Sequence, residues 1–350
     1  MQIVYISNQP EVSAETLEHV AGWMPFITSA VFVCPARLEA EFQFAGGLAV
    51  TVIAEERLLG ERLRRFRHTT DHQAKNWLLR SALAYAAEIA AEFIMSDDDS
   101  RPLAEIPLEF FKESGQYHSY YFYDLANWRP RASDYDRGQH TTRSLLVRKG
   151  LPTLSYSSHM PQIINRRILR EVGEWFDRTA ERRSAVDEWS LYFNYAHREY
   201  PELFHPPQPF RTLCWPALPT DWEYDVRPPG FEFENFYPRL YEPDGIFGDL
   251  PSRFQPREQG AITRLKIERR EQLRRIYDSW PARLRRKAAW IAHRTLVRWR
   301  DAAARAPRVT RWLAPLVPAA LRRLAREIVL HGDDPAWSFP RPRRRKPVAR

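Results

Sequence analysis

Short apolar segments alternate with helix-like segments over the first 100 residues. The segments at 3–8, 30–34 and 48–54 are rich in Val, Ile or Ala and end at polar residues or proline, which is typical of buried strands. Residues 13–22 and 71–92 place apolar side chains at helical spacing. Strands that alternate with helices predict an α/β fold with a mostly parallel sheet flanked by helices.

A further apolar strand, predicted over residues 92–96, leads into Asp97, Asp98 and Asp99. Ligands of open α/β sheets bind at the carboxyl ends of the strands, where these aspartates are expected. Carboxylates two positions apart on an extended segment point the same way, so Asp97 and Asp99 can share one Mg²⁺ or Mn²⁺ that bridges a diphosphate. The chain has no glycine-rich phosphate loop that could replace such a metal. The alternative interpretation is a solvated acidic turn.

His159 is a second candidate. It follows a predicted strand over 153–158 and precedes Pro161, which suits the first turn of a helix. At such a corner, near a positive helix end, His159 can contact phosphate or carry a proton. A histidine that only caps the helix is the alternative. The apolar face of the expected helix comprises Ile163, Ile164, Ile168, Val172, Trp175 and Phe176.

A third candidate group lies in residues 179–189. Asp187 and Glu188 open a predicted helix there, and either carboxylate can accept a proton from an acceptor hydroxyl. Acidic residues are also favoured at helix N-termini for electrostatic reasons alone. Arg182 or Arg183 can hold a phosphate through the planar guanidinium, or be a solvated surface arginine.

The β/α pattern that ends in Asp97-Asp98-Asp99 resembles the nucleotide-sugar-binding half of GT-A glycosyltransferases over about residues 1–215. This resemblance implies a GT-A-like fold and a metal-dependent transferase with a nucleotide-sugar donor. Asp97, Asp99 and His159 are then the expected metal ligands. Asp98, with Ser7 and Asn8 at the end of the first strand, is expected to contact the nucleotide.

The ordered series D-D-D, S-H-x-P and R-R-S-x-x-D-E is also similar to the Stealth family of sugar-phosphate transferases, which make bacterial surface polysaccharides. In that resemblance the acidic pair maps to Asp97–Asp99, the histidine before proline to His159, and the R-x-x-x-D stretch to Arg183 and Asp187. The expected catalytic residues are therefore Asp187, Glu188, His159 and Arg183.

The chain departs from the Stealth pattern next to the aspartates. Ser96 stands where that family has asparagine, and Ser100 and Arg101 stand where it has aromatic residues. Transfer of a sugar and transfer of a sugar 1-phosphate, to a cell-surface glycan or a lipid-linked acceptor, both remain open. A non-enzymatic adaptor at the membrane surface is the alternative from a different class.

Two segments suggest contacts with sugars. Residues 116–140 are dense in Tyr, His and Asp, a composition that suits sugar recognition but equally a half-buried antiparallel ribbon. Residues 216–260 are rich in proline and aromatic residues, and we expect them to form loops on the acceptor side.

Charge divides the chain near residue 260. Of the net charge of +9, residues 261–350 carry +18 and the residues before them −9. The pattern of residues 261–332 predicts basic amphipathic helices, and we expect residues 333–350 to form a disordered basic tail. Helices with Leu and Trp flanked by arginines can lie on an anionic membrane, so residues 283–330 are expected to dock there. The alternative is a helical hairpin on the acidic body, and binding to nucleic acid is not favoured.

Composition excludes several classes of protein. A hydrophobic content of 44% excludes global disorder, and Cys34 and Cys214 alone cannot form a disulfide framework or a cysteine-rich zinc site. The sequence shows no apolar stretch of transmembrane length and no signal peptide at Met1–Tyr5. We therefore expect a cytoplasmic protein that associates peripherally with the inner face of the cell membrane.

Overall fold

The computed structural model describes most of the first 277 residues of the chain. The described residues are 1–42, 44, 47–127, 134–179, 185–213, 230–243, 245–251 and 259–277, with single positions at 280 and 284.

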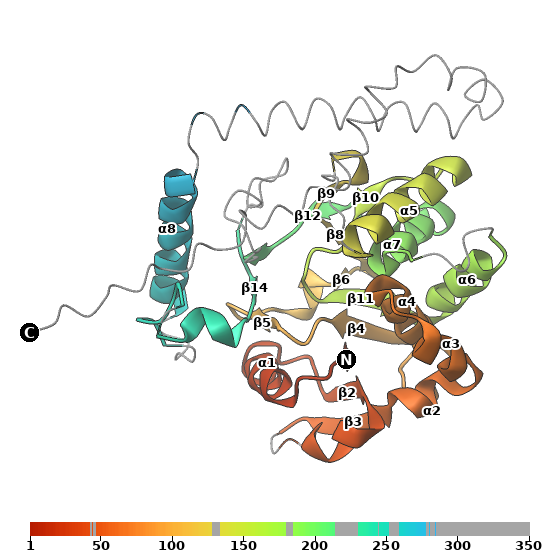
Figure 1. Ribbon diagram of the computed structural model, residues 1–350, viewed down its shortest axis with the longest axis horizontal. Helices are drawn as coiled ribbons and strands as arrows, with labels where there is room; N and C mark the ends of the chain where they lie inside the picture. The colour runs from red at the N-terminus through yellow and green to blue at the C-terminus, as the bar shows by residue number, and fades with distance from the viewer. Residues whose placement is uncertain are drawn as a thin grey trace, which may run out of the picture.

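A five-stranded sheet forms the centre of the fold, in the order β11-β4-β1-β2-β3 (Figure 1). Strands β1 to β4 are parallel, and β11 runs antiparallel to β4 at the edge. This architecture confirms the predicted α/β fold with a mostly parallel sheet. The strands are β1 (Gln2–Ile6), β2 (Ser29–Cys34), β3 (Ala49–Ala54), β4 (Glu92–Ser96) and β11 (Gln162–Asn165).

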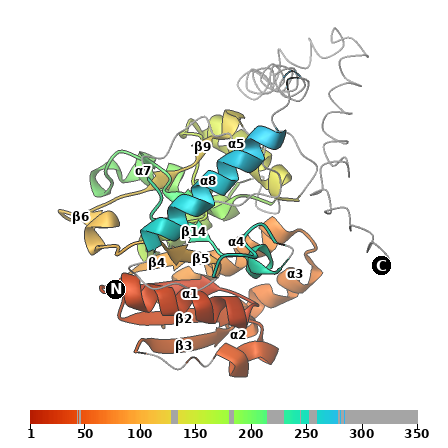
Figure 2. The ribbon, with the colours of Figure 1, turned by 90° about the vertical axis from the view of Figure 1, so that its left-hand side faces the viewer.

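Helices cover both faces of this sheet. Helix α1 lies on one side, and α4 lies on the other with α5, α6 and α7 packed around it (Figures 1 and 2). The described α-helices are α1 (Pro10–Trp23), α2 (Glu55–Leu59), α3 (Leu63–His68), α4 (His72–Ala82), α5 (Asp134–Lys149), α6 (Arg166–Asp177), α7 (Glu188–Glu199) and α8 (Gln259–Tyr277). The 3₁₀ helices are η1 (Ala36–Phe42), η2 (Gly60–Arg62), η3 (Leu83–Tyr85), η4 (Leu108–Phe110), η5 (Leu125–Asn127), η6 (Pro201–Leu203) and η8 (Pro238–Tyr241).

Short strands beyond the main sheet bring distant segments together. One three-stranded sheet has the order β13-β14-β5, so that residues 233–235 pair with the segment directly after the three aspartates. The remaining pairs are β6 with β7, β8 with β12 and β9 with β10. Their bounds are β5 (Ser100–Pro102), β6 (Lys112–Glu113), β7 (Gln116–Tyr117), β8 (Tyr120–Tyr121), β9 (Tyr123–Asp124), β10 (Leu154–Ser155), β12 (Gln208–Pro209), β13 (Thr212–Leu213) and β14 (Phe233–Asn235).

The core follows from the apolar composition of the central strands. Ile3 and Val4 of β1 have no exposed surface, nor do Phe93 and Ile94 of β4. Consecutive residues of a strand point to opposite faces, so a strand covered by helices on both faces is apolar without alternation. In the tyrosine-rich segment, Tyr117, Tyr120 and Tyr123 are also buried, within short paired strands.

The predicted helix that begins at Pro161 is wrong at its start. Residues 162–165 form β11, in which Ile163 pairs with Ile94 of β4, and α6 begins only after Asn165. Ile163 and Ile164 are both fully buried, which a strand between two apolar layers allows for successive residues. His159 therefore precedes a strand and does not lie at a helix N-terminus.

The predicted helix over 71–92 is too long. Helix α4 ends at Ala82 and continues as 3₁₀ helix to Tyr85, which is half exposed. Ile89 and Phe93 continue the helical spacing of apolar residues in the sequence. In the structure Ile89 is buried in the loop after the helix, and Phe93 is buried in β4.

Several predictions fall wholly or partly outside the described residues. They are the Arg182–Arg183 pair, residues 216–229 and 252–258 of the proline-rich region, the membrane-docking segment 283–330 apart from Leu284, and the basic tail. Within the part of the chain that the structure describes, none of the helices has the length and apolarity needed to cross a lipid bilayer.

Candidate functional site

Asp98 is held at the carboxyl edge of the main sheet by Ser7, directly after β1, and by Thr16 of α1. The Ser7 hydroxyl donates a hydrogen bond to the Asp98 carboxylate, and Thr16 Oγ1 donates to the Asp98 carbonyl at 2.6 Å. Burial, and then the charge of Asp97, raise the pKa of Asp98 to about 6, although the Ser7 hydrogen bond opposes this. Ser7 thus lies beside Asp98, whereas Asn8 is exposed.

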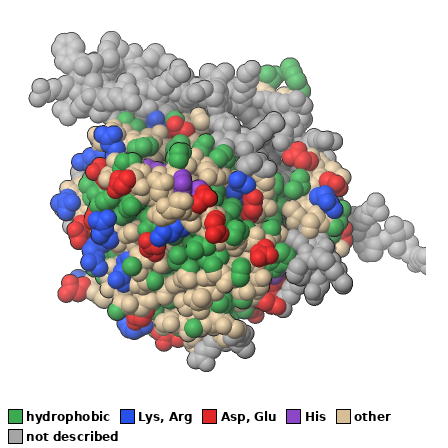
Figure 3. All heavy atoms as spheres, turned by 180° about the vertical axis from the view of Figure 1, so that it is seen from behind, with side chains coloured by type: hydrophobic (Ala, Val, Ile, Leu, Met, Phe, Trp, Pro, Cys, Tyr) green, Lys and Arg blue, Asp and Glu red, His purple; other side chains and the backbone are tan. Residues whose placement is uncertain are grey.

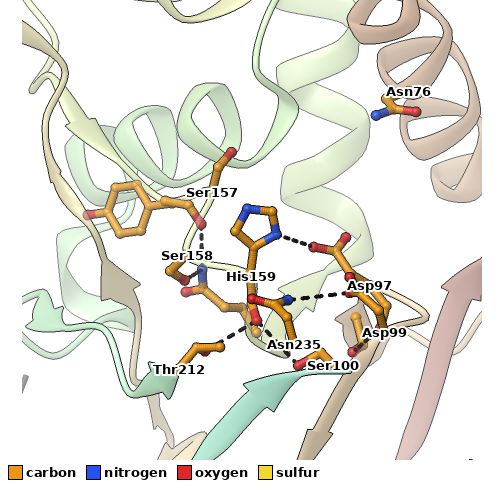
Figure 4. Close-up of polar contacts among 12 residues, drawn as sticks. Asn76, Asp97, Asp99, Ser100, Ser157, Ser158, His159, Thr212 and Asn235 are labelled. Atoms are coloured by element: carbon orange, nitrogen blue, oxygen red, sulfur yellow. Dashed lines mark hydrogen bonds and ion pairs between the residues drawn. The ribbon is translucent and has the colours of Figure 1, made fainter. Parts of the chain in front are cut away.

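Asp97 lies between two cationic groups. Arg80 of α4 donates from Nη2 to Oδ1 at 2.7 Å. On the other side, His159 Nδ1 is 3.5 Å from Oδ2 (Figure 4). Burial alone would raise the pKa of Asp97, but the His159 hydrogen bond and the Arg80 charge outweigh burial and lower it well below its usual range. Asp97 is therefore an ionised carboxylate whose charge is already balanced.

Asp99 has the opposite environment. Asn235 Nδ2 donates to Oδ1 at 3.4 Å, and among the described residues no cation pairs with this carboxylate. Burial, and then the charge of Asp97, raise the pKa of Asp99 to about 7. The aspartate cluster therefore has more negative charge than its cationic neighbours balance at neutral pH, and this excess lies at Asp99.

His159 has an unusual backbone conformation. Its φ of +50° lies in the left-handed region, which a residue with a side chain adopts only when its surroundings fix it. The hydroxyls of Ser100 and Thr212 fix it by donating to its carbonyl oxygen at 3.3 and 3.2 Å (Figure 4). The side chain is 41% exposed. The partial burial of the ring lowers the pKa of His159, but the hydrogen bond to Asp97 and the charge of Asp97 outweigh this effect and raise it.

Asp187 caps α7, as its sequence position predicts. Its Oδ1 accepts from the Ser190 amide at 2.7 Å, and its Oδ2 accepts from Gln139 Nε2 at 2.7 Å and from the Ser157 hydroxyl. The side chain is buried. Both carboxylate oxygens thus already accept hydrogen bonds from the protein, so Asp187 has a structural role and little capacity to take a substrate proton.

Glu188, the next residue, has one carboxylate oxygen that accepts no hydrogen bond from the described residues. Its Oε1 pairs with Arg80 Nε at 3.0 Å, whereas its buried Oε2 has no hydrogen-bond partner among the described residues. Burial raises the pKa of Glu188 to about 8 despite the opposing charge of Arg80. A pKa raised in this way is suited to a general acid or base that works near neutral pH.

Arg80 connects the two acidic groups, and sequence reasoning missed it. Its guanidinium pairs with both Asp97 and Glu188 and lies over the Trp189 ring, with 4.5 Å from Cζ to the ring centroid. A weak signal existed, because Arg80 falls three residues after Trp77 on the apolar face of α4. Asn235 was also missed, and no local signal marks it, because only the pairing of β14 with β5 brings it to Asp99.

The residues expected to hold a metal come together only in part. Asp97 and Asp99 lie at the same edge as His159, but Asp97 is engaged by Arg80 and His159, and a charged His159 repels a cation. Asp99 is the carboxylate that a cation would suit best. The described group of three metal-ligating side chains whose donor atoms lie within 4.8 Å of one another is elsewhere, at Glu113, His118 and His205.

No protein-family model and no curated protein matches this chain. Among solved structures, the apo form of mouse xyloside xylosyltransferase 1 is similar, with a TM-score of 0.38 and 12% sequence identity over 67% of this chain and 98% of that chain. A similarity of this size identifies neither a family nor a reaction, so the residues of the site carry the functional argument.

Proposed function

We propose that this chain is a GT-A-type glycosyltransferase that takes a sugar from a nucleotide-sugar donor. The observation that carries the proposal is the placement of three aspartates at the carboxyl end of β4, of which Asp99 has no salt-bridge partner among the described residues. Burial and the charge of Asp97 accordingly raise the pKa of Asp99 to about 7. A divalent cation bound to the diphosphate of a donor would balance this charge.

In this proposal Asp99 is the main ligand of Mg²⁺ or Mn²⁺, and Asp97 shares its carboxylate between the metal, Arg80 and His159. When bound, the metal supplies positive charge that stabilises the leaving diphosphate. His159 is charged when it pairs with Asp97, so it contacts a phosphate oxygen and does not bind the metal. Asp98 and Ser7 line the nucleotide side of the site.

Glu188 is the proposed base. On acceptor binding its buried Oε2 must turn toward the acceptor hydroxyl and take its proton. The hydroxyl oxygen then attacks the anomeric carbon while the bond from that carbon to the diphosphate oxygen breaks. A pKa of about 8 suits this role, because a base is most effective when its pKa lies near the working pH. Arg80 positions Glu188 and Asp97 relative to each other.

The acceptor and the place of action belong to the same proposal. A cell-surface glycan or a lipid-linked acceptor at the inner face of the cell membrane would agree with the basic composition of residues 261–350.

Titration calorimetry with UDP and GDP, with and without Mn²⁺, tests the proposal. We expect the wild-type chain to bind one of these nucleotides in the presence of Mn²⁺, and Asp99→Asn to lose the metal dependence while keeping its circular dichroism. Glu109→Gln, which removes an exposed carboxylate, is the matched control and should bind as the wild type does. Absence of nucleotide binding by the wild type at any metal concentration would contradict the proposal and favour the adaptor.

Product analysis then separates the two transfer reactions. Glycosyl transfer releases a nucleoside diphosphate, whereas Stealth-type transfer releases a nucleoside monophosphate and leaves phosphate between the sugar and the acceptor. Mass spectrometry of the product distinguishes them.

A further inference from the structure

A second group of metal-ligating side chains lies outside the aspartate site. Glu113, His118 and His205 each place one ligand atom within 4.8 Å of the other two. They come from β6, from the residue after β7, and from the segment after η6. In Figure 2 β6 projects from one side of the molecule, and Figure 3 shows histidine side chains next to acidic ones on the face that it draws.

A tight turn brings Glu113 and His118 together. Ser114 and Gly115 join β6 to β7 with φ values of 51° and 86°, and two positive values are typical of a two-residue hairpin turn. Glu113 consequently pairs with Gln116. His118 is two residues beyond Gln116, so it lies diagonally across from Glu113 on the same face of the hairpin.

His205 reaches the hairpin from 87 residues further along the chain. Its amide donates to the Tyr117 carbonyl at 2.9 Å, which places this segment beside β7. The rings of His118 and His205 are stacked, with centroids 4.2 Å apart and an angle of 11° between their planes. His205 Nε2 also lies 3.3 Å from the carbonyl oxygen of Glu113, so His205 contacts both strands of the hairpin.

His118 has a polar neighbour at each ring nitrogen. Gln208 Nε2 lies 3.2 Å from His118 Nδ1, and His118 Nε2 lies 3.7 Å from Glu113 Oε2. With the amide turned so that its oxygen accepts from Nδ1–H, the lone pair of Nε2 points toward Glu113. An outer hydrogen bond of this kind fixes both the tautomer and the ring of a metal ligand.

We propose that Glu113, His118 and His205 bind one Zn²⁺. Two imidazoles and one carboxylate are a ligand set that zinc accepts, with water at a fourth position. In a tetrahedral zinc site the ligand atoms are roughly 3.4 Å apart. The donor atoms of the three side chains must therefore move closer to one another by about 1 Å. Glu113 can make most of this movement, because its side chain is 57% exposed.

The bound zinc would link two segments that are distant in the sequence. It would join the β6–β7 hairpin to the segment that connects α7 with β12 and β13, and β13 carries Thr212, whose hydroxyl donates to the His159 carbonyl. None of the three ligands takes part in the proposed transfer reaction. The zinc site therefore does not depend on the proposed function.

Cobalt and zinc titrations of the full chain test the site. We expect the metal-free protein to bind one Co²⁺ with the visible absorption of a tetrahedral ion, and Zn²⁺ to displace it. Zn²⁺ should also raise the midpoint of thermal unfolding by roughly 5 °C. His205→Ala and Glu113→Gln should each weaken metal binding at least about tenfold. Loss of a residue that only hydrogen-bonds to a metal ligand can already weaken binding by this factor, and loss of the ligand itself should weaken it at least as much.

Two further variants separate this site from other histidines and from the aspartates. His68→Ala removes an exposed histidine and should leave zinc binding unchanged, as should Asp99→Asn. Loss of the cobalt spectrum in Asp99→Asn but not in His205→Ala would overturn the proposal and assign the metal to the aspartates. Equal binding by the wild type and by a folded His118→Gln/His205→Gln double variant would overturn it as well.

Discussion

Lys266 Nζ lies 2.9 and 2.8 Å from the two carboxylate oxygens of Glu234, and neither side chain has exposed surface. Arg101 donates to the same carboxylate at 2.7 Å. The residue after Glu234 on β14 is Asn235, which donates to Asp99. This buried charge cluster therefore fixes both α8 and β14 beside the aspartate site.

Lys266→Met is predicted to destabilise the fold. The substitution preserves most of the side-chain volume but leaves Glu234 paired with Arg101 alone, and breaking a buried ion pair costs about 3 kcal/mol or more. The free energy of unfolding, measured by urea denaturation, checks this.

The control for Lys266 is on the same helix. Arg269 pairs with Asp249, whose side chain is 66% exposed, and exposed ion pairs contribute little to stability. Arg269→Met should therefore cost much less than Lys266→Met. Equal costs for the two variants would mean that α8 is not held through Glu234.

Glu188 predicts a pH dependence of stability. Its pKa is raised from 4.5 to about 8, so between these values the folded state binds more protons than the unfolded state. The contribution of Glu188 to stability must then fall as the pH rises through this window. Relative to Glu188→Gln, the wild type should lose roughly 2–4 kcal/mol of unfolding free energy between pH 4.5 and pH 8.

The measurement is urea unfolding of both proteins at several pH values. Glu174→Gln, an exposed position on α6, is the control and should follow the wild type at every pH. A constant difference between the wild type and Glu188→Gln across the window would show that Glu188 titrates at its ordinary pKa.

Arg80 and Glu188 should be energetically coupled. Arg80→Met leaves the Glu188 carboxylate buried without its counter-charge, so it should be costly at pH values above about 8, where Glu188 is mostly ionised. The same substitution in a Glu188→Gln background should cost about 1–3 kcal/mol less, because no charge is left behind at that position. A double-mutant cycle in urea measures this coupling, and strict additivity would contradict the 3.0 Å contact.

The sequence predicted those parts of the site that depend on local order along the chain. The strand before Asp97–Asp99, the edge at which they lie and the opening of a helix at Asp187 and Glu188 all follow from short-range patterns. They are visible because a buried parallel strand is apolar throughout and a helix N-terminus attracts acidic residues.

Contacts between distant segments could not be predicted in the same way. Lys266 lies on a basic helix whose sequence does not indicate which part of the protein it contacts. Its burial is explained by the ion pair with Glu234, 32 residues earlier. The Ile163-Ile164 pair satisfies helical spacing as well as a buried strand, so the pattern alone could not exclude a helix. In the structure these residues pair with β4 and form a strand, so His159 does not lie at a helix N-terminus as expected.

The left-handed backbone of His159 predicts an unusual order of stability among its variants. Alanine and glycine both remove the contact with Asp97, so they differ mainly in backbone preference. At a φ of +50° a side chain costs about 1–2 kcal/mol relative to glycine, so His159→Gly should be more stable than His159→Ala by about 1 kcal/mol. At the neighbouring Ser158, whose φ is not positive, the order should reverse. Urea unfolding of the four variants decides the matter, since an alanine variant more stable than glycine at position 159 would mean that the Ser100 and Thr212 hydroxyls do not hold this carbonyl in place.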